Sequence, residues 1–159
     1  MAGKLEKQLK KKRGFDSPQQ ETVLGLLRTN DLMQYHVAQL LRQYELTQPQ
    51  YNILRILRGE GTPLPCLEIA DRMITMVPAI TGLIDKLEKR KLVFRERCSK
   101  DRRVWFVHLT DSGKKLLARL DKPVLDLYQD LCGGLTKTEC REMSRLMEKA
   151  RDHIERTAN

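Results

Sequence analysis

Histidine and aromatic residues are scarce in this 159-residue chain, which has three His, one Trp, three Phe and four Tyr. No histidine has another His or Cys three or four residues away, so the spacing of a helical zinc site is missing. No run approaches the roughly 18 apolar residues that a membrane-spanning helix requires. The sequence therefore predicts neither a metal site nor a membrane partner.

Cysteine is also sparse, and its four residues lie far apart. They form neither a C-x-x-C pair nor a cluster with histidine, which argues against a structural metal. The first residues contain no apolar segment of a secretory signal, so we expect a cytoplasmic protein with reduced thiols. The four positions are Cys66, Cys98, Cys132 and Cys140.

Recognisable catalytic motifs are absent from the sequence. There is no Ser/His/Asp arrangement, no G-x-x-x-x-G-K-[ST] phosphate loop and no dinucleotide-binding fingerprint. The chain is therefore predicted not to be an enzyme and to need no cofactor.

Positive charge is abundant but confined to two segments. Residues 1–13 hold six Lys or Arg and one acid, net +5, and residues 86–103 hold nine and three, net +6. Since the whole chain has a net charge of +9, the remainder carries −2. A charge concentrated in this way predicts a surface that binds a polyanion.

Three helix starts combine a hydroxyl with a Gln or Glu three residues later, at Ser17, Thr47 and Thr136. The first predicts a helix of roughly 27 residues that ends near residue 44. Because so long a helix cannot be covered by a chain of this size, we expect it to pack against a partner chain. The second helix is expected to end at Gly59, before a loop at 59–65.

The middle of the chain predicts a helix-turn-helix followed by a hairpin. A short helix at 65–73, a turn of three to four residues and a helix at 77–90 form the motif. Alternating patterns at 92–97 and 103–109 predict two strands. A helix then runs from Thr110 to Gly133, kinked or split by Pro123, and a last helix from Thr136 to about Glu155.

The predicted fold class is mainly α (α+β), with a winged helix-turn-helix lobe. Residues 1–16 are expected to be a basic, disordered tail, and residues 17–156 a single domain. The lobe is assigned to 46–110, with its helix-turn-helix at about 65–90 and its wing at about 92–109. The long helices at 17–45 and 111–156 are assigned to dimerisation.

Such a lobe predicts binding to double-stranded DNA. The second helix of the motif fits the major groove, and the basic tip of the hairpin reaches the minor groove or the phosphates. Asp85 is a candidate for an ion pair with a nearby cation. The predicted DNA contacts are Thr75, Pro78, Ala79, Thr81, Gly82, Lys86, Lys89, Lys100, Arg102 and Arg103.

The same segment resembles the MarR family of bacterial transcriptional regulators. The resemblance rests on residues 77–88, Leu92-Val93, Asp101-Arg102-Arg103, Leu109-Thr110 and Gly113. It implies a homodimer held by the first and last helices, often with a small aromatic effector between lobe and dimer region. It also implies that Asp101 braces Arg103 while the wing arginines reach the minor groove.

Two positions depart from the family pattern. Gly82 stands where members often carry an arginine that faces DNA, so either the DNA backbone approaches closely there or one contact is lost. Lys91 replaces a common glycine at a helix end, which forfeits an easy left-handed cap.

The function predicted is a sequence-specific transcriptional regulator, a homodimeric repressor acting on a pseudo-palindromic operator. His36, expected on the interior face of the long helix, is either a core residue or an effector contact. The alternatives are a winged-helix protein-interaction module, a redox regulator that uses Cys66 or Cys98, and a DNA binder without sequence preference.

Overall fold

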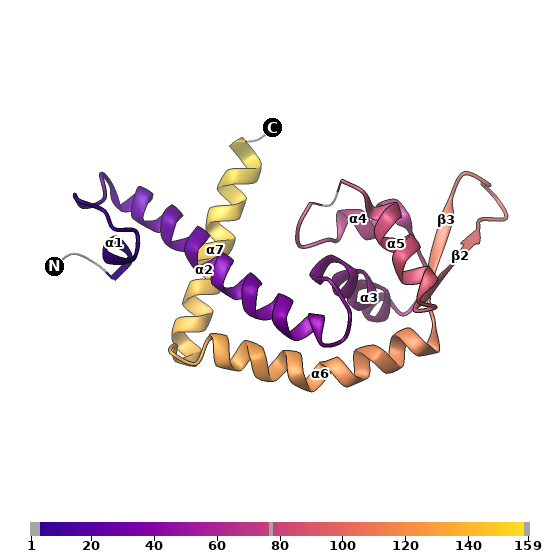
Figure 1. Cartoon of the computed structure of the whole chain (residues 1–159). Coiled ribbons are helices and arrows are strands. Elements are labelled where there is room, and N and C mark those ends of the chain that lie inside the picture. Colours follow the sequence, from indigo (N-terminus) through magenta and orange to yellow (C-terminus); the bar gives the residue numbers. More distant parts are fainter. Residues whose placement is uncertain (1–3, 77, 158–159) are drawn as a thin grey trace. The chain divides into compact units, whose positions relative to one another are not determined.

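The computed structural model describes residues 4–76 and 78–157, and the chain divides into two compact units between Ala118 and Arg119. The elements of the first unit, in chain order, are α1 (Lys4–Gln8), α2 (Pro18–Arg42), α3 (Gln48–Glu60), β1 (Leu64–Pro65), α4 (Cys66–Asp71), α5 (Ile80–Lys89), β2 (Val93–Arg97) and β3 (Trp105–Leu109). Helix α6 (Asp111–Leu131) begins in the first unit and ends in the second, where α7 (Lys137–Thr157) follows. The mainly helical winged-helix prediction is confirmed (Figure 1).

The predicted helix starts are confirmed by their caps. The Gln50 amide donates to Thr47 Oγ1 over 3.4 Å, and the Thr47 amide donates to Gln50 Oε1 over 2.9 Å, which completes a capping box. Thr136 and Glu139 make the same reciprocal pair. Ser17 caps α2 from one side only, because the Gln20 side chain accepts from the Asp16 amide instead.

The end of α3 differs from the prediction by one residue, and the segment after it contains a short strand that was not predicted. The helix continues through Gly59 to Glu60, since Gly61, at φ 75°, takes the left-handed capping position. Leu64 and Pro65, predicted to be loop, pair with β3 opposite Val107 and Phe106. The sheet thus has the antiparallel order β1-β3-β2. Two residues are too few to reveal an alternating pattern, so the sequence did not indicate β1.

The turn of the helix-turn-helix is longer than predicted. Helix α4 ends at Asp71 and α5 begins at Ile80, not at Val77, which lies outside the described residues. Ala79, at φ −133°, lies outside helical geometry and provides no side-chain cap. The first turn that Val77 was expected to start is therefore displaced past the proline.

The core of the winged-helix lobe is apolar. Figure 1 shows α4 and α5 beside the hairpin of β2 and β3, and buried side chains fill the space among these elements and α3. The largest fully buried members are Ile53, Leu54, Ile69, Ile84, Leu87, Val93 and Val107.

Helix α6 is continuous through Pro123, so of the two predicted outcomes, a kink or a split, the split does not occur. Leu120 and Val124, on either side of the proline, are both buried, and this anchoring offsets the lost backbone hydrogen bond. By contrast, every residue of α7 is at least partly exposed in the single chain.

The predicted disordered tail contains the short helix α1. Its residues Lys4–Gln8 have high helix propensity, and Lys11 Nζ lies 4.9 Å from the centre of the Phe15 ring. Within the described ranges, none of the helices combines the length and the apolar character that crossing a membrane takes.

Candidate nucleic-acid interface

Helix α5 has a buried face and an exposed face. Ile84 and Leu87 are fully buried and fix the helix to the lobe. The opposite face and the turn before it are open to solvent, as a major-groove reader requires. The exposed residues here include seven predicted DNA contacts: Thr75, Pro78, Ala79, Thr81, Gly82, Lys86 and Lys89.

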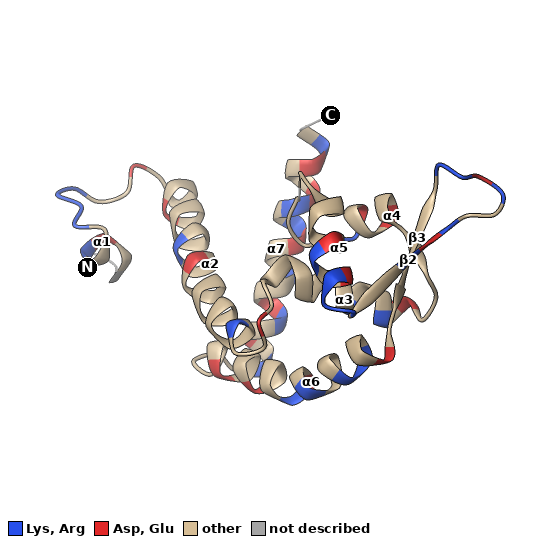
Figure 2. Cartoon of the chain, turned by 45° about the vertical axis from the view of Figure 1, so that its right-hand side comes forward, with Lys and Arg blue, Asp and Glu red and all other residues tan. Residues whose placement is uncertain are grey.

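The tip of the wing presents the other three predicted contacts, Lys100, Arg102 and Arg103, and all are exposed. Figure 2 shows Lys and Arg positions, in blue, along the loop between β2 and β3. Asp101 Oδ1 accepts from the backbone amide of Arg103 over 2.9 Å, so it orders the backbone of the turn. The bracing that the resemblance implied thus acts on the main chain.

An ion cluster joins the recognition helix to the wing. Arg95 of β2 donates from Nη2 to Asp85 Oδ1 and to Glu88 Oε2, each over 2.7 Å. Its backbone amide also donates to Glu88 Oε1 over 2.8 Å. The predicted pairing of Asp85 with a nearby cation is confirmed, whereas Glu88 and Arg95 had not been identified as functional. Because three hydrogen-bonded groups span the two elements, α5 and the wing are held at a fixed relative position.

This cluster predicts a pH-dependent stability. The hydrogen bond from Arg95 lowers the pKa of Glu88 below its usual value. A depressed carboxyl pKa adds stability above the unfolded pKa of about 4.3, and this stability is lost as pH falls through the folded pKa. We expect Glu88→Gln to reduce the free energy of unfolding by about 1 kcal/mol at pH 7, after allowance for partial exposure, and by progressively less as the pH falls through the folded pKa of Glu88. Urea unfolding across this pH range measures the difference.

Glu142 provides the matched control for this measurement. Its hydrogen bond with Arg145 also lowers its pKa, but the pair is fully open to solvent on α7. Glu142→Gln should leave stability unchanged, because exposed pairs contribute little. Equal losses in the two variants would contradict a special role for the Arg95 cluster.

Not every cation of the basic segment 86–103 is available for DNA. Besides Arg95, Arg90 is used by the fold: its guanidinium donates to the backbone carbonyls of Tyr44, over 3.3 Å, and Glu45. Two of the nine cations therefore hold the lobe together. The exposed lysines of α5 and the wing tip carry the charge that a phosphate backbone would meet.

Gly82 lies in open space, since a Cβ built there would have no neighbour within 4 Å. We expect Gly82→Ala to raise the free energy of unfolding by about 1 kcal/mol, because Ala has the higher helix propensity. Thermal unfolding of the free protein checks this, and unchanged stability would contradict it. The DNA affinity of the Gly82→Ala variant then separates the two interpretations of this glycine. Weaker binding indicates that DNA approaches the glycine closely, and unchanged binding indicates that a contact is missing there.

The start of α6 is clamped to the end of the recognition helix. Lys91 adopts the left-handed conformation, at φ 58°, that a glycine would accept more easily. The Thr110 hydroxyl lies 2.8 Å from the Lys91 carbonyl and 2.9 Å from that of Leu92, and it accepts from the Gly113 amide over 3.1 Å. Gly113 is buried, and a Cβ there would lie 2.4 Å from the Leu92 carbonyl oxygen. The Leu-Thr-x-x-Gly motif thus has a structural role.

His36 was predicted on the interior face of the long helix, but it does not lie in the interior of the chain. It is exposed on α2, with its ring edge-on to Tyr35 at 5.4 Å between centroids. The error arises because helical periodicity identifies a face but not what covers it.

The cysteines are free thiols, as predicted. Cys66 Sγ lies 3.8 Å from the Trp105 carbonyl oxygen, and burial raises the pKa of this thiol. A thiol with a raised pKa is a weaker nucleophile at neutral pH, which argues against Cys66 as a redox sensor.

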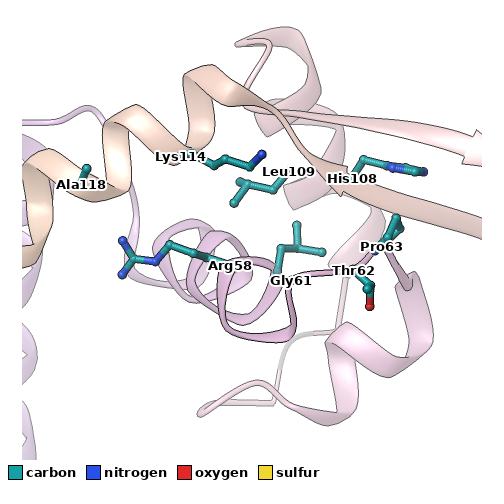
Figure 3. A pocket seen from close by; sticks show the side chains of 9 residues that line it. Arg58, Gly61, Thr62, Pro63, His108, Leu109, Lys114 and Ala118 are labelled. Carbon is teal, nitrogen blue, oxygen red and sulfur yellow. The ribbon is translucent and has the colours of Figure 1, made fainter.

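A cavity of about 400 Å³ lies within the lobe, between the end of α3, the end of β3 and the start of α6. Leu57, Leu109 and Ala118 contribute apolar walls. Figure 3 shows the Lys114 side chain close to Leu109, with the Arg58 and His108 side chains extending in opposite directions. The apolar walls together with Lys114, which also pairs with Asp111 over 3.2 Å, suit a small organic anion.

The comparison with known proteins agrees with this geometry. The MarR family model matches residues 46–105. The HTH-type transcriptional regulator FarR of Neisseria gonorrhoeae is 30% identical over 105 residues, which cover 66% of this chain and 71% of FarR.

Two solved structures extend the likeness. A MarR transcription factor from Planctomyces limnophilus is 44% identical, with a TM-score of 0.67 over 84% of this chain and 98% of that one. The Staphylococcus aureus MepR–DNA complex is 26% identical, with a TM-score of 0.72 over 80% of this chain and 95% of that one. The chain with the buried α5 anchor and the exposed basic wing therefore belongs to the MarR family: it is a DNA-binding transcriptional regulator and not an enzyme.

Proposed function

We propose that the protein is a homodimeric repressor that binds a pseudo-palindromic operator, with half-sites about 34 Å apart. The observation that carries this proposal is the ion cluster of Arg95, Asp85 and Glu88, which fixes the exposed face of α5 relative to the wing. Helix α5 then enters the major groove while Arg102 and Arg103 reach the minor groove. Occupancy of a promoter by the dimer excludes the polymerase, in the cytoplasm.

Dimerisation is supported by apolar side chains left uncovered in the single chain. On α2, Val23 and Leu27 are 54% and 60% exposed, and on α7, Leu146 and Ile154 are 50% and 62% exposed. Burial of such side chains against a second copy is favourable by about 25 cal/mol per Å² of apolar surface. Because a symmetric dimer repeats its recognition helix about a two-fold axis, its operator is expected to be palindromic.

Release by a small aromatic anion is part of the same proposal. The cavity of Figure 3 offers apolar walls from Leu57 and Leu109 and a cation at Lys114. Benzoate is the simplest probe: it should raise the melting temperature and lower operator affinity. Lys114→Gln should weaken both effects, whereas Lys122→Gln, an exposed substitution on α6, should leave them unchanged.

The test of DNA recognition is selection of bound duplexes from a random pool at about physiological salt. Enrichment of a two-fold symmetric site would support specific regulation and supply the operator. Binding without enrichment would indicate a protein with no sequence preference, since phosphate contacts alone still give salt-dependent binding. Absence of binding would favour the protein-interaction module.

A further inference from the structure

The recognition helix lacks the side chains that most often read bases through paired hydrogen bonds. Helix α5, Ile80–Lys89, contains no Arg, Asn or Gln. Arginine or lysine reads guanine and Asn or Gln reads adenine in this bidentate manner, so on α5 only the lysines could do so. Gly82 stands at an open position of the helix, and Asp85 is occupied by Arg95. The exposed face therefore offers Thr81 and two lysines, Lys86 and Lys89, but no planar Arg, Asn or Gln group for direct readout.

Apolar groups are instead exposed in the turn that leads into α5. Ile74 is 70% exposed and Met76 is 100% exposed, and both neighbour Thr75. Pro78 and Ala79, immediately before the helix, are exposed as well. A single exposed apolar residue needs no explanation, but a group of large apolar side chains within a few residues indicates a contact surface.

The charge around this group identifies its partner. Lys86 and Lys89 are exposed on α5, and the basic wing tip belongs to the same lobe (Figure 2). An apolar protein partner would gain nothing from these cations, whereas DNA supplies phosphates for them. In the major groove, the apolar feature of a base edge is the C5-methyl group of thymine. Methyl groups are therefore the matching surface for Ile74 and Met76.

We propose that Ile74 and Met76 contact thymine methyl groups in the major groove, so that the protein selects thymine through its methyl group. The inference rests on the proposed binding of an operator. Thr75, Pro78 and Ala79 complete the surface around the two large side chains. Cytosine has no methyl group at C5, so discrimination between thymine and cytosine follows from loss of this contact together with the changed base-pair edge.

Uracil tests the proposal because it differs from thymine only by the methyl group. On the operator obtained by selection, each thymine of a half-site is replaced singly by uracil, and the dissociation constant is measured for wild type and variants. Loss of one buried methyl group should weaken wild-type binding about fourfold at the contacted thymines. Met76→Ala or Ile74→Ala should reduce this thymine-to-uracil ratio toward one.

Lys100→Ala is the control, because it removes a wing cation without changing the apolar surface. It should weaken binding to the thymine and uracil duplexes equally, as expected for independent sites in a thermodynamic cycle. If wild type binds every uracil duplex as well as the thymine duplex, the inference is overturned while operator binding stands. The inference would also be overturned if both apolar variants kept the wild-type thymine-to-uracil ratio but no longer dimerised. That result would assign the apolar surface to contact with a second copy of the chain.

Discussion

Changing Arg102 and Arg103 together to Ala is expected to lower operator affinity by at least about 100-fold at physiological salt. The two guanidinium groups lie exposed at the wing tip, on a backbone ordered by Asp101. Loss of a single DNA-reading arginine costs about 1–3 kcal/mol, and a dimer loses two from each protomer. If all four contact phosphates, the slope of log affinity against log salt should become less steep by about 3.6.

Fluorescence anisotropy with a labelled operator, repeated at several salt concentrations, measures both quantities. The charge-matched control is the double change of Lys122 and Arg145 to Ala, because both cations lie in exposed ion pairs outside the lobe. This control should retain most of the affinity and nearly the wild-type salt slope. An equal loss in the two double variants would indicate that net charge alone drives binding and would remove the wing from the interface.

Local chemistry explains which parts of the fold the sequence predicted well. Helix starts at Thr47 and Thr136 depend on contacts within four residues, so their motifs are legible in the sequence. The strand at Leu64 depends instead on pairing with Val107, 43 positions along the chain, and two residues carry no periodicity. The late start of α5, at Ile80, could not be read from the helical pattern, because Ala79, at φ −133°, lies outside helical geometry.

The same distinction applies to the candidate site. Exposure of Arg102 and Arg103 could be expected because a polar turn lies between two strands. The cluster of Arg95, Asp85 and Glu88 could not, since it depends on how β2 packs against α5. Asp85 and Glu88 lie three residues apart, one turn of a helix, and this spacing before a basic strand was the available signal. For His36, helical periodicity predicts a face of the helix but not what covers that face.

Gly113→Ala is expected to reduce the free energy of unfolding by about 3 kcal/mol. Its new methyl group would lie 2.4 Å from the Leu92 carbonyl oxygen and 2.6 Å from Leu109 Cδ1. Backbone cannot retreat as a flexible side chain does, so the start of α6 must move away from the end of α5. That movement also weakens the hydrogen bonds that the Thr110 hydroxyl makes with Lys91 and Leu92.

Thermal unfolding at a fixed protein concentration measures the effect of Gly113→Ala, which should lower the melting temperature by about 6–12 °C. Gly59→Ala is the control: it makes the same chemical change inside α3, where a Cβ meets nothing within 4 Å. There the higher helix propensity of Ala should keep or raise stability. Wild-type stability of Gly113→Ala would contradict the clamp, because it would mean that α6 can shift without cost. A large loss confined to Gly113 would instead show that this glycine is required by the close approach of α6 to the Leu92 carbonyl and Leu109, independent of any contact with DNA.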